Sequence, residues 1–318
     1  MNFEKIEKAY DLILENVQLI ENEIKTTIYD ALIEQNSFYL GAAGASDRVS
    51  KNNEVLRQLE LSREEWRRAF QFIFIKASQL EPLQANHQFT PDVIGFLILF
   101  LMDQLVQSKE LDIIEIGSGT GNLAETICNN SQKTINYMGI EIDDLLIDLA
   151  ASIAEIIGTD IHFLQEDAVR PHILKESDVI IADLPVGFYP NDEIASRYQV
   201  ANSDGHTYAH HLLIEQSLKY LKKDGIAILL APMDLLTSEQ SPLLKQWLKD
   251  YADVIAVITL PDNLFGNKTI VKSIFVLQKQ GNVVPETFVY PISDMQDKNV
   301  MNHFIENFTK WSSDNRFF

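Results

Sequence analysis

The chain has 318 residues, 46% of them hydrophobic, which is enough for one large core or two smaller ones and argues against disorder. Its 26 basic and 46 acidic residues leave a net charge of −20, so the field of the whole chain repels polyanions. The single cysteine, Cys128, excludes an intrachain disulfide and a multi-cysteine metal site and fits a reducing compartment. No signal peptide is visible, and the longest apolar run, 93–102, is shorter than the about 20 residues that span a bilayer. We therefore expect a cytoplasmic protein.

Residues 1–85 are predicted to form a helical domain, followed by a second domain over 86–318. The first helix carries one narrow apolar seam with a 3-4 spacing, made of Phe3, Ile6, Tyr10, Ile13, Val17, Ile20 and Ile24. Further helical patterns cover 25–40 and 62–80, where Ser62 and Glu65 form a capping-box start, and 41–46 is a loop. Two interpretations of the seam stay open: a bundle that closes on itself, or a surface for self-association or for a partner helix.

From residue 111 onward, predicted strands alternate with helices. The strands are 111–116, 134–140, 160–164, 178–182, 225–231, 253–260 and 271–279, and the clearest helices are 143–157 and 209–221. This alternation predicts an α/β fold with a mostly parallel sheet and helices on both faces. The last two strands have no convincing helix between them, which favours an antiparallel pair. In such sheets a ligand lies beyond the carboxyl ends of the strands.

A glycine turn follows the first of these strands. Gly117, Gly119 and Gly121 lie in "IIEIGSGTGN", where missing side chains let a ligand approach the backbone. The dinucleotide pattern G-x-G-x-x-G would need glycine at position 122, which is Asn122.

Acids accompany three successive strand ends around this turn. Glu115 precedes the turn, Glu141 ends the second strand where it can accept ribose hydroxyls, and Asp167 follows the third within reach of an adenine amino group. Three acids disfavour a pyrophosphate and favour a cationic, phosphate-free nucleoside. The sequence therefore predicts a site for S-adenosylmethionine (SAM).

The fourth strand ends on a carboxylate in "DVIIADLPVG". With the segments at 87–102, 114–122, 220–236 and 254–279, this loop resembles class I SAM-dependent methyltransferases over residues 86–280. Within them it is similar to adenine-N6 DNA methyltransferases, such as the methylation subunits of type I restriction-modification systems and a stand-alone group of YtxK type in Gram-positive bacteria. The resemblance implies a Rossmann-like, seven-stranded SAM-methyltransferase sheet.

The resemblance also implies roles for individual residues. It assigns cofactor binding to Phe89, Thr90, Pro91, Glu115, Gly117, Gly119, Gly121, Glu141, Ile142, Asp167 and Ala168, and the catalytic loop to Asp183, Leu184 and Pro185. An exocyclic amine is a poor nucleophile, because its lone pair is delocalised, so acceptors must hold its N–H groups. The Asp183 carboxylate and the Leu184 carbonyl are the expected acceptors.

The same loop departs from the family pattern, in which Asn or Asp is followed by Pro, Pro and an aromatic residue. Here the order is Asp183, Leu184, Pro185, Val186, so the ring on which a flipped base stacks is missing. Phe188 or Tyr189 are candidates to replace it. The following stretch, 188–208, is either a lid or an ordinary surface excursion. We expect its histidine, His206, and the neighbouring His210 and His211 to be surface or capping residues, and we predict no metal site.

We therefore predict an N-methyltransferase that acts on an exocyclic amino or amide nitrogen. Two alternatives stay open: a noncatalytic SAM-binding or assembly protein, and a methyltransferase that acts on RNA or protein. No separate target-recognition domain is evident, so we expect nucleic acid to bind weakly to the chain alone and a protein partner to be needed. Two basic clusters, Arg63, Arg67 and Arg68 and Lys219, Lys222 and Lys223, are interpreted as solvated faces rather than a binding strip.

Overall fold

The computed structural model describes residues 1–83, 90–262, 264, 271–280 and 286–315. The chain divides into two compact units. Unit 1 consists of Met1–Phe89, Ser118–Asn130 and Glu141–Gln165, and unit 2 consists of Thr90–Gly117, Ser131–Ile140 and Glu166–Phe318. The predicted boundary between 85 and 86 lies outside the described residues and stays a prediction. In the described part of the chain, no helix combines the length and the apolar character needed to cross a membrane.

Unit 1 is mainly helical. Its elements are α1 (Phe3–Ile24), α2 (Ile28–Leu40), α3 (Asp47–Gln58), α4 (Arg63–Leu80), α6 (Asn122–Asn130), α7 (Asp144–Ile157) and the short strand β3 (Ile161–Gln165). The expected capping box opens α4, since the Ser62 hydroxyl and the Glu65 carboxylate each accept from the other's backbone N–H. Helix α3 was not predicted, because its sequence is too polar to show an apolar period.

The seam of α1 lies in the core of unit 1. Ile6, Ile13, Val17 and Ile20 are buried against residues of α2, α3, α4 and α7, whereas the seam's ends, Phe3 and Ile24, are exposed. The core also contains a network of amides in which Asn16 contacts Gln35, Asn52 and Asn53 at 2.8–3.2 Å. Buried amides need partners, so this network favours one helix register. The seam thus closes a bundle, the first of the two interpretations.

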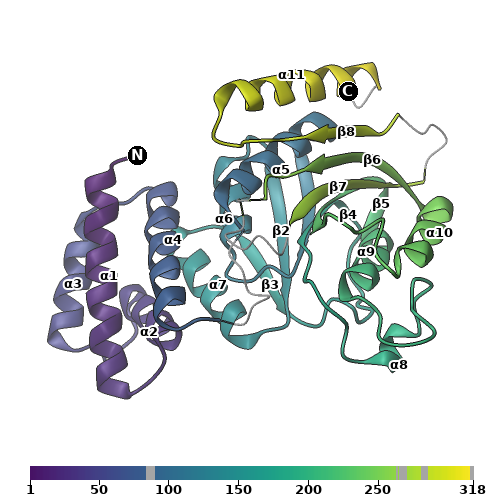
Figure 1. Cartoon of the computed structure of the whole chain (residues 1–318). Coiled ribbons are helices and arrows are strands. Elements are labelled where there is room, and N and C mark those ends of the chain that lie inside the picture. Colours follow the sequence, from purple (N-terminus) through teal and green to yellow (C-terminus); the bar gives the residue numbers. More distant parts are fainter. Residues whose placement is uncertain (84–89, 263, 265–270, 281–285, 316–318) are drawn as a thin grey trace. The chain divides into compact units, whose positions relative to one another are not determined.

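Unit 2 is built on a twisted sheet (Figure 1). Its strands are β1 (Glu110–Ile116), β2 (Thr134–Glu141), β4 (Ser177–Asp183), β5 (Leu221–Pro232), β6 (Ala252–Thr259), β7 (Lys272–Lys279) and β8 (Phe288–Pro291). Their order is β2-β1-β4-β5-β7-β6-β8. The pairs β1/β2, β1/β4 and β4/β5 are parallel, whereas β7 runs antiparallel to both β5 and β6. The predicted parallel sheet with an antiparallel final pair is confirmed.

The described helices of unit 2 are α5 (Asp92–Leu105), α8 (Asp192–Ala195), α9 (Ala209–Tyr220), α10 (Ser241–Tyr251) and α11 (Lys298–Asp314). Strand β8 is the one described strand that was not predicted, because its four residues are too few to show a pattern. Helix α11 runs alongside β8 (Figure 1). Phe304 and Phe308 of α11 contact Phe288 of β8 and Phe100 of α5, which buries the edge of the sheet under aromatic rings.

Candidate active site

The registers of three parallel strands bring the predicted site residues to one edge of the sheet. Ile116 on β1 pairs with Ile140 on β2 and with Ala182 on β4. The next residues along the chain are Gly117, Glu141 and Asp183. Because parallel strands have their carboxyl ends on the same side of a sheet, these three residues lie at or directly after strand ends at one edge. Ligands of such sheets bind at that edge.

The glycine turn is held by backbone contacts and by Glu141. Gly117, Gly119 and Gly121 all have positive φ, at 71°, 53° and 76°, which strains any other residue. The Gly117 N–H donates to the Ile140 carbonyl over 2.8 Å. Glu141 is 7% exposed, and its carboxylate accepts from the backbone N–H groups of Gly119, Ile142 and Asp143 at 2.8–3.0 Å. Glu141 therefore fixes the turn, in addition to any contact with a ligand.

Two further observations indicate that this turn is shaped for a ligand. A Cβ at Gly117 or Gly119 would have no atom within 4 Å, so the space beside both residues is open. A Cβ at Gly121 would instead meet Ala150 and Phe163 of unit 1 at 3.2 and 3.3 Å. Between Gly117 and Gly119, the buried Ser118 hydroxyl has no hydrogen-bond partner among the residues that the structure describes. A buried polar atom of this kind calls for a partner from outside the chain.

The other two predicted acids have structural partners. Glu115 is buried in β1 and accepts from the Tyr137 hydroxyl over 2.9 Å. Asp167 accepts from the Tyr189 hydroxyl over 2.6 Å and from the Val169 backbone N–H over 3.0 Å. Burial, together with Asp167, raises the pKa of Tyr189 to about 12. Tyr189 is only 7% exposed, so its ring is not a stacking surface.

The Asp183 carboxylate has two side-chain partners that the sequence reasoning missed. Lys272, the first residue of β7, pairs with Oδ1, and the Thr90 hydroxyl donates to Oδ2 over 3.0 Å. Lys272 is only 6% exposed, so the ion pair is largely shielded from water. The sequence held one signal for this contact, because Lys272 lies beside the apolar residues of β7. A lysine at such a position is buried with its strand and needs an acidic partner. Leu184 continues the strand, because its N–H donates to the Leu230 carbonyl over 2.9 Å.

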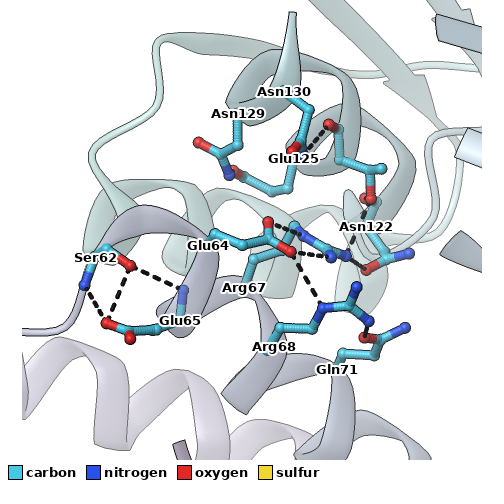
Figure 2. A network of polar contacts seen from close by, with 11 residues as sticks. Ser62, Glu64, Glu65, Arg67, Arg68, Gln71, Asn122, Glu125, Asn129 and Asn130 are labelled. Atoms are coloured by element: carbon cyan, nitrogen blue, oxygen red, sulfur yellow. Dashed lines mark hydrogen bonds and ion pairs between the residues drawn. The ribbon is translucent and has the colours of Figure 1, made fainter. Parts of the chain in front are cut away.

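A network of polar contacts around the buried Arg67 lies in unit 1 (Figure 2). It includes Asn122, the residue that follows the glycine turn. Arg67 of α4 donates to the Glu64 carboxylate at 2.7 and 2.8 Å, and to Asn122 and Thr126 of α6 at 3.4 and 3.1 Å. Arg67 is 2% exposed, so its interpretation as part of a solvated face is wrong. On the same helix α6, burial raises the pKa of Glu125 to about 7 against hydrogen bonds from Thr159 and Asn129.

The second basic cluster is also engaged by acids. Lys222 pairs with Asp112 and Asp178 at 2.9 and 2.8 Å, and Lys219 pairs with Glu215 at 3.0 Å. These contacts draw both ammonium groups to the protein's own carboxylates. They are therefore unsuited to neutralise phosphates.

The histidine expectation holds for one residue and is wrong for two. His206 is exposed and lies 2.9 Å from Asp192. His210 and His211 are buried, and burial lowers the pKa of His210 to about 4 and that of His211 to about 3. Both rings are therefore neutral at neutral pH. Within the residues that the structure describes, no group of three potential ligands could hold a metal ion.

The segment 188–208 is anchored rather than a simple surface excursion. Tyr189, Tyr198 and Val200 are buried, and the backbone N–H groups of Gln199 and Val200 donate to Glu215 of α9. Of the remaining predicted site residues, Pro91 caps α5. Phe89 lies outside the described residues, and the assignment of the whole set to cofactor and acceptor stays a prediction.

Comparison with known proteins identifies the family and two relatives of this chain. The N-6 DNA methylase family matches residues 62–312. YtxK of Bacillus subtilis, an uncharacterised protein, is 34% identical over 275 residues, which are 83% of each chain. A protein of Methanocaldococcus jannaschii whose proposed activity is protein N5-glutamine methylation is 28% identical over 150 residues, which are 46% of this chain and 74% of that one.

Solved structures agree on the fold. A Listeria monocytogenes protein assigned to the class I SAM-dependent methyltransferases superposes with a TM-score of 0.90 at 27% identity and covers 98% of this chain and 100% of its own. The methyltransferase subunit of a type I restriction-modification system from Streptococcus thermophilus superposes with a TM-score of 0.67 at 15% identity, over 83% of this chain and 61% of that one. The fold is that of class I SAM-dependent methyltransferases, with SAM as cofactor. The chain belongs to the N-6 DNA methylase family.

Proposed function

We propose that the chain transfers a methyl group from SAM to an exocyclic amino nitrogen, with adenine of a nucleic acid as the acceptor. The observation that carries this proposal is Asp183, a carboxylate at the end of β4 whose two oxygens are held by Lys272 and Thr90. A carboxylate that is held in one orientation at the carboxyl end of a strand can accept a hydrogen bond from the N–H group of an acceptor. The N-6 DNA methylase family favours an adenine amino group as the source of that nitrogen.

The proposed chemistry needs no covalent link to the protein. SAM supplies an electrophilic methyl group bonded to a sulfonium. Asp183 and the Leu184 carbonyl accept the N–H groups of the acceptor, which directs the nitrogen lone pair at the methyl carbon. Transfer would leave S-adenosylhomocysteine as the neutral thioether, and the N–H proton of the methylated nitrogen would be lost to water. Each oxygen of Asp183 already has one partner and keeps capacity for a second.

The proposed cofactor residues are those of the glycine turn and the strand ends. Gly117 and Gly119 would leave space for SAM, Gly121 would hold the shape of the turn through its positive φ, and the Ser118 hydroxyl would gain a partner. Glu141 would add ribose hydroxyls to the backbone N–H groups that it already accepts. The remaining proposed contacts are Thr90, Pro91, Ile142, Asp167 and Ala168, of which Ile142 directly follows Glu141 in the sequence.

Two other candidates have support of their own. The similarity to a protein linked with glutamine N5-methylation favours a side-chain amide as acceptor, because an amide nitrogen presents the same N–H groups. The replacement of the family's aromatic residue by Val186 favours a noncatalytic SAM-binding protein.

Methyl-labelled SAM separates the three candidates. The full chain is incubated with fractionated DNA, RNA and protein from a bacterial lysate, and label in each fraction is counted. We expect label in nucleic acid, recovered as N6-methyladenine by mass spectrometry. Label in protein would favour the amide acceptor, and label in no fraction while calorimetry still detects SAM binding would favour the noncatalytic protein.

A further inference from the structure

Three aromatic rings, those of Phe188, Tyr208 and His210, form a stacked column. Phe188 follows the Asp183 loop in the sequence. Phe188 and Tyr208 stack with their ring centroids 4.8 Å apart and their planes within 5°. Tyr208 in turn stacks on His210, at 5.1 Å and 17°. The His206 ring lies tilted against Phe188, with its centroid 6.1 Å away. The column therefore presents Phe188 as its terminal ring.

Backbone hydrogen bonds hold the column in place. Phe188 and Tyr208 form an antiparallel bridge, in which the Tyr189 N–H donates to Thr207 over 2.8 Å and the Ala209 N–H donates to Gly187 over 2.9 Å. The buried His210 ring makes a hydrogen bond to the backbone of Pro185, two residues after Asp183. Both ends of the stack are thus tied to the loop that carries the proposed acceptor groups.

The Phe188 ring is exposed, although the next residue in the sequence, Tyr189, is buried. Phe188 is 55% exposed, whereas Tyr189 points to the opposite side of the bridge and is 7% exposed. This alternation is that of extended backbone, in which successive side chains face opposite directions. A phenyl ring fixed by a stack and left open to solvent is a preorganised surface for a second flat ring, because little side-chain freedom remains to be lost on binding.

We propose that Phe188 is the stacking surface for a planar heteroaromatic acceptor, a nucleobase, in the methyl transfer proposed above. This proposal rests on that function and adds the residue that would bind the ring of the acceptor. A glutamine amide offers a much smaller flat surface, so the column favours a base over a protein side chain. The phenyl ring lies five residues beyond Asp183, and with the column beneath it supplies the aromatic surface that Val186 lacks.

A fluorescent base tests the proposal. The full chain, saturated with S-adenosylhomocysteine, is titrated at low salt with a short single-stranded DNA that carries one 2-aminopurine, whose fluorescence is quenched by stacking. We expect quenching by the wild type. We expect Phe188→Leu to bind about 5- to 150-fold more weakly and Phe188→Trp to bind at least as tightly as the wild type. The matched control, Val186→Ala, changes an apolar residue of the same loop without removing a ring and should bind within about twofold of the wild type.

Each outcome decides the proposal. Equal binding by Phe188→Leu, or absence of quenching in the wild type, would overturn it, as would Phe188-independent methylation of a glutamine-containing peptide. Calorimetry with SAM on the same proteins separates the two levels. Normal SAM binding by all variants confines a negative result to the stacking surface, whereas no SAM binding by the wild type contradicts the proposed function itself.

Discussion

Glu141 ends strand β2 and Asp183 ends strand β4, and the groups that hold the two carboxylates differ in kind. Glu141 is held by three backbone N–H groups, all within a few residues of a strand end or the glycine turn. Asp183 is held by two side chains, from Thr90 and Lys272, that are distant in sequence. Backbone donors follow from the local fold, whereas side-chain donors can be exchanged by mutation. The proposed cofactor region is thus shaped mainly by backbone contacts, whereas the proposed acceptor region depends on individual side chains.

The largest expected effect comes from removing the cation beside Asp183. Lys272→Met leaves a carboxylate shielded from water without its counter-charge, and we expect a loss of about 3–5 kcal/mol in the free energy of unfolding. Urea unfolding measures it. The double variant Asp183→Asn with Lys272→Met removes both charges and should be clearly more stable than Lys272→Met alone. A single variant as stable as the double one would mean that the pair makes no net electrostatic contribution.

Glu141 sharpens the comparison from the other side. Glu141→Ala leaves three backbone N–H groups without their acceptor and removes the proposed ribose contact, so we expect SAM binding to weaken by about 1–3 kcal/mol in calorimetry. Glu155→Ala serves as the control, since Glu155 is an exposed acid of α7 with no proposed contact to SAM. Equal SAM affinity in the Glu141 variant and the wild type would remove Glu141 from the cofactor site.

Glu125 shows what happens to a buried carboxylate when burial outweighs its partners. Its pKa rises from 4.5 to about 7, so between these values the unfolded chain is ionised while the folded chain keeps the proton. Stability from this group is therefore present below pH 4.5 and lost as the pH rises to about 7. We expect Glu125→Gln to gain on the order of 1–3 kcal/mol relative to the wild type above pH 7. Paired denaturant titrations below and above this window measure the change, and a pH-independent difference would contradict the assignment.

The smallest expected signal is the affinity of the chain alone for duplex DNA. The net charge of −20 and the pairing of Arg67, Lys219 and Lys222 with acids leave little to neutralise phosphates. We expect a dissociation constant no better than about 10⁻⁴ M at physiological salt. A mobility-shift titration at several salt concentrations measures it, and micromolar, salt-sensitive binding would show that the acceptor region carries its own DNA surface.

The sequence predicted the glycine turn and the strand ends better than the side-chain contacts around Asp183. Strands β1, β2 and β4 are apolar runs, and the glycines at 117, 119 and 121 reveal a turn because only glycine adopts its φ values without strain. The pairing of Lys272 with Asp183 could not be read in the same way. It depends on β7 inserting between β5 and β6, a long-range event that no local period encodes.

The histidines and Arg67 illustrate the same limit. Their polar side chains predict exposure, yet His211 lies in the core of unit 2 and Arg67 in that of unit 1. Phe188 and Tyr189 were equivalent candidates in the sequence. Only the bridge to Tyr208 decides which of the two rings is exposed.

Separating SAM binding from methyl transfer at Asp183 tests the central claim most directly. Asp183→Ala and Asp183→Asn are each combined with Lys272→Met, so that no unpaired charge remains, and the variant with Asn retains a carbonyl acceptor. Calorimetry measures SAM affinity, and methyl-labelled SAM measures transfer to the acceptor fraction that the wild type labels. We predict that the variant with Ala binds SAM within about 1 kcal/mol of the wild type yet transfers no methyl group, while the variant with Asn retains measurable transfer. Unchanged transfer by the variant with Ala would contradict the role of Asp183.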